Sequence, residues 1–330
     1  MMRVPIEQLK QTTLQAILNS GYDASEADII LDVLMYAQLR GNNQGIIKLT
    51  GAGMPKSADA GQIRIEHETK LSARLDGAQN QGMVVLTRAT DMALEKAHAH
   101  DIGMVGTRNT CSSTGAIGYY ASRIAREGFI GLIFAGSRPA VAMYGSYEPL
   151  FGTNPLAIGI PSAAKPIVFD MATSAMAWFG ILEAKIAGKM LPQGVAYDPE
   201  GQLTTDPAAA LAGAIRPFGG YKGAALSLIV EVLTGPLVGS AFAGLGYYQH
   251  DWGNLVLAIN PELLVDRETF LSNVAQLTER VKAAKPLPGV EEILIPGERG
   301  DRLLEAVQQA GVVEIEDNLW TELQKAAARA

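Results

Sequence analysis

The sequence predicts an α/β fold with a mixed β-sheet and with helical regions at both ends. Apolar residues recur with helical spacing in the first forty residues, and from residue 83 onward helical patterns alternate with short, continuously apolar segments. This alternation is typical of a domain in which helices cover a central sheet. With 330 residues, of which 48% are hydrophobic, the chain can bury a large core without disulfides or metal ions.

Two helices are expected before residue 40. The apolar residues of the segment 6–18 form a stripe with a period near 3.6 residues, which stops at Gly21. Ser25 and Asp28 resemble a capping box, so a second helix is expected from Glu26 to Leu39. Between residues 45 and 77 the periodicity weakens, which predicts a loop with short strands.

The remaining elements alternate along the chain. Helices are expected over residues 83–100, 115–127, 175–187, 223–233 and 267–285. Strands are expected around 104–105 and over 129–135, 156–160, 166–169, 255–259 and 293–295, before a terminal αβα segment. The chain is accordingly divided into an N-terminal helical region (1–75), an α/β region (76–265) and a C-terminal αβ segment (266–330) that packs back on the N-terminal region.

Composition excludes several classes of protein. The net charge of −7 disfavours nucleic-acid binding, which needs a basic surface. Cys111 is the one cysteine, so an internal disulfide is impossible, and the polar N-terminus shows no secretory signal. The apolar stretch 224–246 contains Glu231 and Pro236, so a buried helix followed by a glycine-rich turn is favoured over a membrane span. We expect a cytoplasmic protein with no membrane or nucleic-acid partner.

Common cofactor and catalytic signatures are missing. Gly244 and Gly246 lack the third glycine of a Rossmann fingerprint, and no lysine has the surroundings of a P-loop. His98 and His100 lie two residues apart on a predicted helix and so face different directions, and no metal site is expected. No histidine is close to Cys111 in sequence, which favours an inert thiol over a nucleophile.

Five other segments are distinctive and occur in a fixed order. They are Phe151–Ala157 (FGTNPLA), Phe169–Ser174 (FDMATS), Leu191–Asp198 (LPQGVAYD), Thr204–Pro207 (TTDP) and Pro217–Gly223 (PFGGYKG). Together they resemble the type-2 malate/lactate dehydrogenase family, which includes ureidoglycolate dehydrogenase, sulfolactate dehydrogenase, diketogulonate reductase and piperideine-2-carboxylate reductase. The resemblance covers essentially the whole chain and implies a homodimeric oxidoreductase that binds NAD or NADP outside a Rossmann fold, in the region 76–265.

The resemblance also implies which residues contact the cofactor. Asp170 at a strand end can accept hydrogen bonds from ribose or amide groups, and Lys222 in a glycine-rich turn offers a charge to the pyrophosphate. From the residues alone, a turn-capping role for Asp170 and a solvated surface position for Lys222 are favoured over cofactor binding. The implied cofactor contacts are Ser137, Thr153, Asn154, Asp170, Met171, Ala172, Lys222, Gly297, Glu298 and Arg299.

The catalytic positions depart from the family pattern. Family members read R-G-x-x-S-H-G-x-x-R after the second helix, whereas residues 40–48 read RGNNQGIIK, one residue shorter. Gln44 then stands at the histidine, and Ser113 replaces a second common histidine. Glutamine can donate a hydrogen bond but cannot give up a proton. The candidate catalytic residues are Gln44 and Ser113 to orient the substrate, Lys48 or Arg40 to hold its carboxylate, and Asp198 as an acid or as a turn carboxylate.

Three functions follow from this pattern. The first is transfer of a hydride to or from a small 2-oxo or 2-hydroxy carboxylate. The second is reduction of a cyclic 2-imino carboxylate, because hydride addition to a protonated imine needs no acid from the enzyme. The third is a nicotinamide-binding protein with impaired catalysis.

Overall fold

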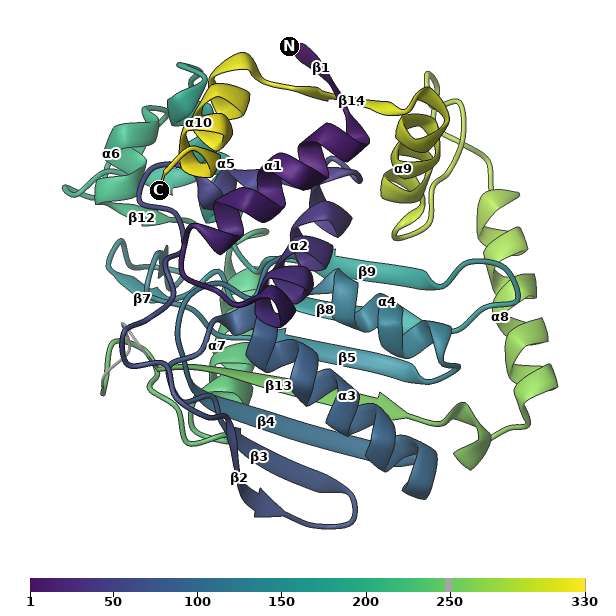
Figure 1. Cartoon of the computed structure of the whole chain (residues 1–330). Helices are drawn as coiled ribbons and strands as arrows, with labels where there is room; N and C mark the ends of the chain where they lie inside the picture. Colours follow the sequence, from purple (N-terminus) through teal and green to yellow (C-terminus); the bar gives the residue numbers. More distant parts are fainter. Residues whose placement is uncertain (247–250, 330) are drawn as a thin grey trace.

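A seven-stranded sheet forms the centre of the molecule (Figure 1). The computed structural model describes residues 1–246 and 251–329 of the chain. Across the sheet, the strands are β2 (Arg64–Glu68), β3 (Ser72–Asp76), β4 (Ile102–Thr110), β13 (Trp252–Ile259), β5 (Ile130–Ala135), β8 (Leu156–Ile160) and β9 (Ile167–Met171). β3 and β4 run parallel, and each other pair of neighbours is antiparallel. The expected mixed α/β fold is confirmed.

Helices cover both faces of this sheet. α3 (Gly82–His100) and α4 (Gly118–Arg126) lie on one face, and α7 (Tyr221–Thr234) lies on the other (Figure 1). Glycines in the strands allow close approach: a Cβ atom at Gly103 would collide with a backbone carbonyl oxygen of α3, and one at Gly159 with a carbonyl oxygen of α4.

A second, smaller sheet lies beside the first one and has its own core. Its strands, in spatial order, are β11 (Leu203–Thr204), β10 (Ala196–Tyr197), β12 (Ala214–Ile215), β6 (Val141–Ala142) and β7 (Pro149–Phe151). α5 (Trp178–Ile186) and α6 (Pro207–Ala212) pack with them. Val141, Ile181 and Ile215 are buried in this core. The strands have only two or three residues each, so packing rather than hydrogen bonding holds this part together.

The two ends of the chain lie together. β1 (Met2–Pro5) pairs with β14 (Val312–Ile315), and α1 (Ile6–Leu18) packs against α10 (Asp317–Ala327). Leu9 and Trp320 from these helices belong to the same buried core as Ile133 of the central sheet. The other elements are α2 (Ala24–Gln38), η1 (Ile46–Leu49), η2 (Pro261–Leu263), α8 (Arg267–Lys282) and α9 (Glu298–Ala310).

Two sequence expectations about local structure are wrong. The capping box of α2 is formed by Asp23 and Glu26, each accepting a hydrogen bond from the other's backbone N–H at 3.0–3.1 Å. Ser25 instead donates to the Asp23 carboxylate at 2.7 Å. The strand expected over residues 293–295 is irregular, because the Ile295 N–H is bound by the carboxylate of Glu298 at 3.2 Å in the turn before α9.

The expected buried helix after residue 223 is present as α7, but it is not fully buried. Leu228, Ile229 and Val232 are 44%, 54% and 46% exposed along one side. An apolar surface and an apolar core give the same sequence pattern, so the sequence could not separate them. Within the part of the chain that the structure describes, no helix combines the length and apolarity needed to cross a bilayer.

Candidate active site

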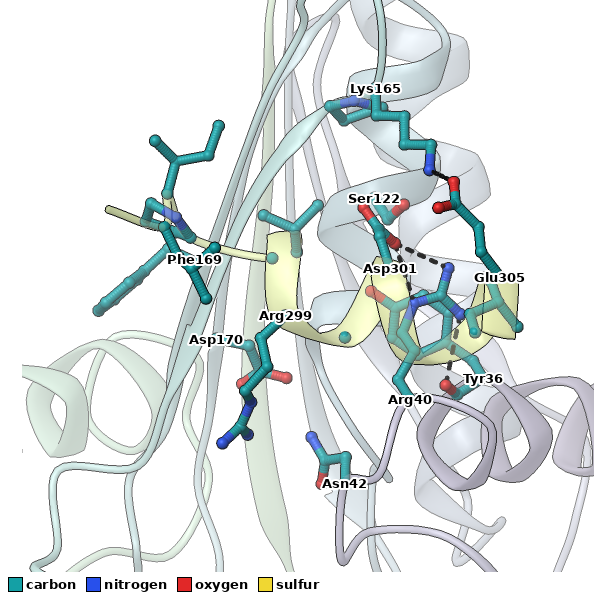
Figure 2. Close-up of a pocket in the computed structure, with 18 of the residues that line it drawn as sticks. Tyr36, Arg40, Asn42, Ser122, Lys165, Phe169, Asp170, Arg299, Asp301 and Glu305 are labelled. Atoms are coloured by element: carbon teal, nitrogen blue, oxygen red, sulfur yellow. Dashed lines mark hydrogen bonds and ion pairs between the residues drawn. The ribbon is translucent and has the colours of Figure 1, made fainter. Parts of the chain in front are cut away.

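Two cavities meet at Asp170, where β9 ends. The larger has a volume of about 1290 Å³ and lies between the central sheet and the small sheet. The smaller, of about 790 Å³, lies between β9 and α9 (Figure 2). Asp170 and Asn42 line both cavities. This arrangement offers one elongated site with an acidic group near its middle.

Asp170 is fixed by the beginning of α4. Its carboxylate accepts a hydrogen bond from the Gly118 N–H at 2.8 Å, and a Cβ atom at Gly118 would lie only 3.0 Å from the carboxylate oxygen. The side chain reaches solvent through the cavities, yet protein atoms surround it closely. This desolvation raises the pKa of Asp170 to about 6, against the lowering effect of the Gly118 hydrogen bond.

Ser113 and Gln44 lie on the wall of the larger cavity. Ser113 follows β4, and Gln44 is held in the loop after α2 by the bond from its N–H to the Asn42 side chain at 3.0 Å. Behind Ser113, Lys48 of η1 is 2% exposed and donates to the Ser113 hydroxyl at 2.8 Å. Lys48 is not among the residues that line either cavity. Among the described residues lining the two cavities, none is a histidine.

The larger cavity has one cationic side chain among its described lining residues, Arg138. It follows β5, and its guanidinium lies 4.5 Å from the centre of the Trp178 ring at the start of α5. Arg138 is not among the residues predicted from the sequence, although it directly follows Ser137 in a loop that begins at the carboxyl end of a buried strand. Such a position is a reasonable one for a substrate contact.

Arg40 lies at the smaller cavity and is already engaged there. Its guanidinium stacks on Tyr36 at 4.0 Å and pairs with Asp301 of α9 at 3.3 Å (Figure 2). Gly297 and Arg299 also line this cavity, as Asp170 does (Figure 2).

The other residues singled out from the sequence are distributed around the cavities. Ser137, Thr153 and Ala172 line the larger cavity. Asn154 is fully buried and donates to the Glu231 carboxylate at 2.7 Å. Met171 is the last residue of β9. The carboxylate of Glu298 is paired with Lys282 and Arg302.

Lys222 and Asp198 lie outside the lining of both cavities. Lys222 is exposed in the first turn of α7, and the loop before it is bonded to the strand end near Asp170 through Phe218 and Thr173 at 3.0 Å. Asp198 accepts hydrogen bonds from the backbone N–H groups of Glu200 and Gln202 at 3.0 and 2.8 Å, as a turn-capping residue does. No group of side chains suited to a metal ion is found in the described residues.

The structure combines a non-Rossmann α/β fold with an elongated site that has an acidic group near its middle, and comparison with known proteins identifies the class as nicotinamide-dependent dehydrogenases. The family model described as malate/L-lactate dehydrogenase matches residues 4–324. The chain belongs to this family, and it is an NAD(P)-dependent, malate/lactate dehydrogenase-like 2-hydroxyacid dehydrogenase.

Relatives and solved structures agree with this assignment. The chain is 38% identical to the L-sulfolactate dehydrogenase of Methanothermobacter thermautotrophicus, over 90% of this chain and 88% of that relative. It is 33% identical to a Δ1-pyrroline-2-carboxylate/Δ1-piperideine-2-carboxylate reductase of Pseudomonas putida, over 96% and 95% of the two chains. The crystal structure of malate dehydrogenase from Entamoeba histolytica superposes with a TM-score of 0.89 at 28% identity, covering 99% of this chain and 97% of that one.

Proposed function

We propose that this dehydrogenase interconverts a small 2-oxo acid and its 2-hydroxy acid in the larger cavity, with the dinucleotide extending from there past Asp170 into the smaller cavity. The observation that carries the proposal is the position of Asp170, which lines both cavities. When bound, the nicotinamide would supply or remove the hydride. The residues of the chain bind and orient the substrate and exchange a proton with it.

The cofactor placement is supported by the chemistry of the lining. Asp170 can accept hydrogen bonds from ribose hydroxyls, and Arg299 offers a positive charge in the smaller cavity. Gly115, Ala116 and Ile117, just before α4, line the larger cavity, so the positive end of that helix faces it. Lys222 adds an exposed positive charge in the first turn of α7. The cofactor would then be contacted through the backbone of Met171, Gly297 and Glu298.

We propose that Arg138 holds the substrate carboxylate, rather than Lys48 or Arg40. Lys48 is occupied by Ser113, and Arg40 is occupied by Asp301. Arg138 is the cation on the wall of the larger cavity, and a guanidinium can bind a carboxylate through two parallel hydrogen bonds. Ser113 and Gln44, on the same wall, can donate to the carbonyl oxygen of the substrate.

The test is a rate measurement with defined substrates. Oxidation of NADH and of NADPH is followed at the nicotinamide absorbance with pyruvate, oxaloacetate, sulfopyruvate and the cyclic imines Δ1-pyrroline-2-carboxylate and Δ1-piperideine-2-carboxylate. We expect at least one 2-oxo acid to be reduced at a higher kcat/KM than either imine. Reduction of the imines alone would replace the proposal with the imine reductase that the missing histidines suggested, and binding without any turnover would indicate the catalytically impaired protein.

We also propose that the protein is a homodimer that uses its exposed apolar surface. That surface comprises Leu228, Ile229 and Val232 of α7 together with Leu237 and Leu245, which are 55% and 62% exposed. Exposed apolar side chains on α7 and in the segment that follows it can form a protein interface. Sedimentation should give a dimer, and Ile229→Glu should shift it toward the 35.0 kDa monomer. A wild-type monomer at micromolar concentration would contradict this proposal.

We place the protein in the cytoplasm. Cys111 has no second cysteine in the sequence to pair with, and its half-buried thiol suits a reducing compartment. Fractionation of cells that express the full chain tests this location, and recovery from the extracellular medium would contradict it.

A further inference from the structure

Lys48 is a buried amine, and within residues 1–246 and 251–329 its side chain has one polar partner, the hydroxyl of Ser113. Its ammonium nitrogen lies 2.8 Å from the Ser113 oxygen and 3.5 Å from the centre of the Phe179 ring. Phe179 belongs to α5, so the lysine is enclosed between that helix and the loop after β4. Burying an amine at a position that is 2% exposed costs free energy of folding, so stability alone does not explain a lysine there.

The hydrogen bonds of Ser113 leave its proton available to a substrate. The hydroxyl oxygen accepts from Lys48 Nζ at 2.8 Å and from the Gly115 N–H at 3.2 Å. A hydroxyl group has two acceptor positions and one donor, so both acceptor positions are filled while Lys48 is protonated. When Lys48 is a neutral amine, the Ser113 O–H can donate to it, which opens one acceptor position to the substrate hydroxyl. Because Ser113 lines the larger cavity, the remaining O–H can donate to an oxygen atom bound there.

The surroundings of Lys48 allow it to change its protonation state. Burial lowers the pKa of its ammonium group well below the ordinary value, and no charged side chain in the described part of the chain adds to this shift. The Cys111 thiol on the same cavity wall has its own pKa raised by burial and stays neutral. The face of the Phe179 ring stabilises the ammonium form when a proton is bound.

We propose that Ser113 and Lys48 form a proton relay that performs the task of a catalytic imidazole in this chain. In the oxidation direction, the substrate O–H bond breaks and its proton passes to the Ser113 oxygen, while the proton of Ser113 passes to the neutral amine of Lys48. The C2–H bond breaks at the same time, its electron pair leaves as hydride to the oxidised nicotinamide, and a C=O bond forms. Reduction reverses each transfer, so the Lys48 ammonium returns the proton to the new hydroxyl group through Ser113.

This assignment rests on the proposed function and adds the source of the proton to it. Gln44 can orient a carbonyl oxygen but has no proton to exchange, whereas the relay supplies one without a histidine. Ketone reduction therefore does not require the imidazoles that the sequence lacks at these positions. Ser113 is the residue that touches the substrate, and Lys48 acts through it.

Three variants test the relay. Lys48→Met keeps the length and apolar stem of the side chain but removes the amine, and Ser113→Ala removes the hydroxyl. Each should lower kcat with a 2-oxo acid by about 10²–10⁴-fold, the usual size of acid–base assistance. The double variant should fall no further than the lower single variant, because residues that act as one unit are not additive. Lys96→Met is the matched control. Lys96 of α3 is 8% exposed, pairs with Glu68 of β2 and lines neither cavity, so its loss should leave kcat unchanged.

Three further measurements test the relay against a merely structural role. Methylamine should raise the kcat of Lys48→Ala by at least about tenfold, because the added amine replaces the missing one. The size of this increase should change with the pKa of the amine that is added. NADH binding, followed by fluorescence, should be the same in wild type and Lys48→Met. The stability of wild type relative to Lys48→Met should rise with pH toward 10.5, because the unfolded state binds the additional proton.

The outcomes for the relay and for the proposed function differ. If wild type reduces 2-oxo acids and Lys48→Met retains its kcat within about threefold, the relay is wrong and the proposed function stands. If added amines fail to restore activity to a folded, NADH-binding Lys48→Ala, the relay is also wrong. If wild type reduces no 2-oxo acid, the proposed function fails and the relay fails with it.

Discussion

The pH dependence of cofactor binding should report directly on Asp170. Its pKa is raised to about 6 by desolvation, and only the ionised carboxylate offers two oxygen acceptors to ribose hydroxyls. Binding should therefore be strongest above pH 6 and weaken as the pH falls through that value. With a pKa of about 6 the ionised fraction is about 0.9 at pH 7 and about 0.1 at pH 5, so NADH should bind about tenfold more weakly at pH 5.

The assay is a fluorescence titration of NADH from pH 5 to pH 8 on wild type, Asp170→Asn and Glu183→Gln. Asp170→Asn keeps the shape of the side chain but cannot ionise, so its affinity should be weaker at pH 7 and independent of pH. Glu183 also has a pKa raised by burial but lines neither cavity, and its variant should keep the wild-type profile. An Asp170→Asn protein with an unchanged pH profile would refute the placement of the cofactor beside this carboxylate.

Three further predictions concern the remaining charged groups. Arg138→Gln should raise KM for a 2-oxo acid by about 10²-fold, because a charge-assisted pair with the carboxylate is lost. The affinity for NADH should stay the same. An unchanged KM in steady-state kinetics would contradict this prediction. Lys222→Ala should weaken NADH binding by no more than about fivefold, since an exposed charge contributes about 0–1 kcal/mol, and equal affinity in the two proteins would remove Lys222 from the site. Asp198→Ala should keep turnover within about twofold. It should lower the free energy of unfolding by about 1 kcal/mol, because two turn hydrogen bonds are lost. A large loss of turnover with intact stability would instead make Asp198 the acid.

The fold was predictable where a single periodicity governed a segment. The strand over 156–160 has the predicted bounds, and α3 starts one residue before the predicted helix. The short strands of the second sheet, such as β10 and β12, have two residues each and leave no periodicity to recognise. The turn before α9 was mistaken for a strand because its apolar residues line a cavity rather than a sheet.

The site was predictable where sequence motifs persist and not where long-range contacts decide the role of a residue. Asp170 of the FDMATS segment and Ser113, at the position of a family histidine, both line a cavity, while their roles stay predictions. The engagement of Arg40 by Asp301, 261 positions away, depends on how α9 packs and has no local signal. The same is true of Lys48 and Ser113, which are 65 residues apart. Arg138 has a local signal, its position at a strand end, but its role depends on the absence of other cations from the described cavity wall.

The most direct test of the account is a crystal structure of the protein with NADH and oxamate, an unreactive analogue of pyruvate. The account predicts the nicotinamide and oxamate in the larger cavity, with the oxamate carboxylate on Arg138 and its carbonyl oxygen within hydrogen-bonding distance of Ser113. It also predicts a ribose at Asp170 and the adenosine end beside Arg299. A cofactor bound away from Asp170, or a carboxylate held by Lys48, would contradict it.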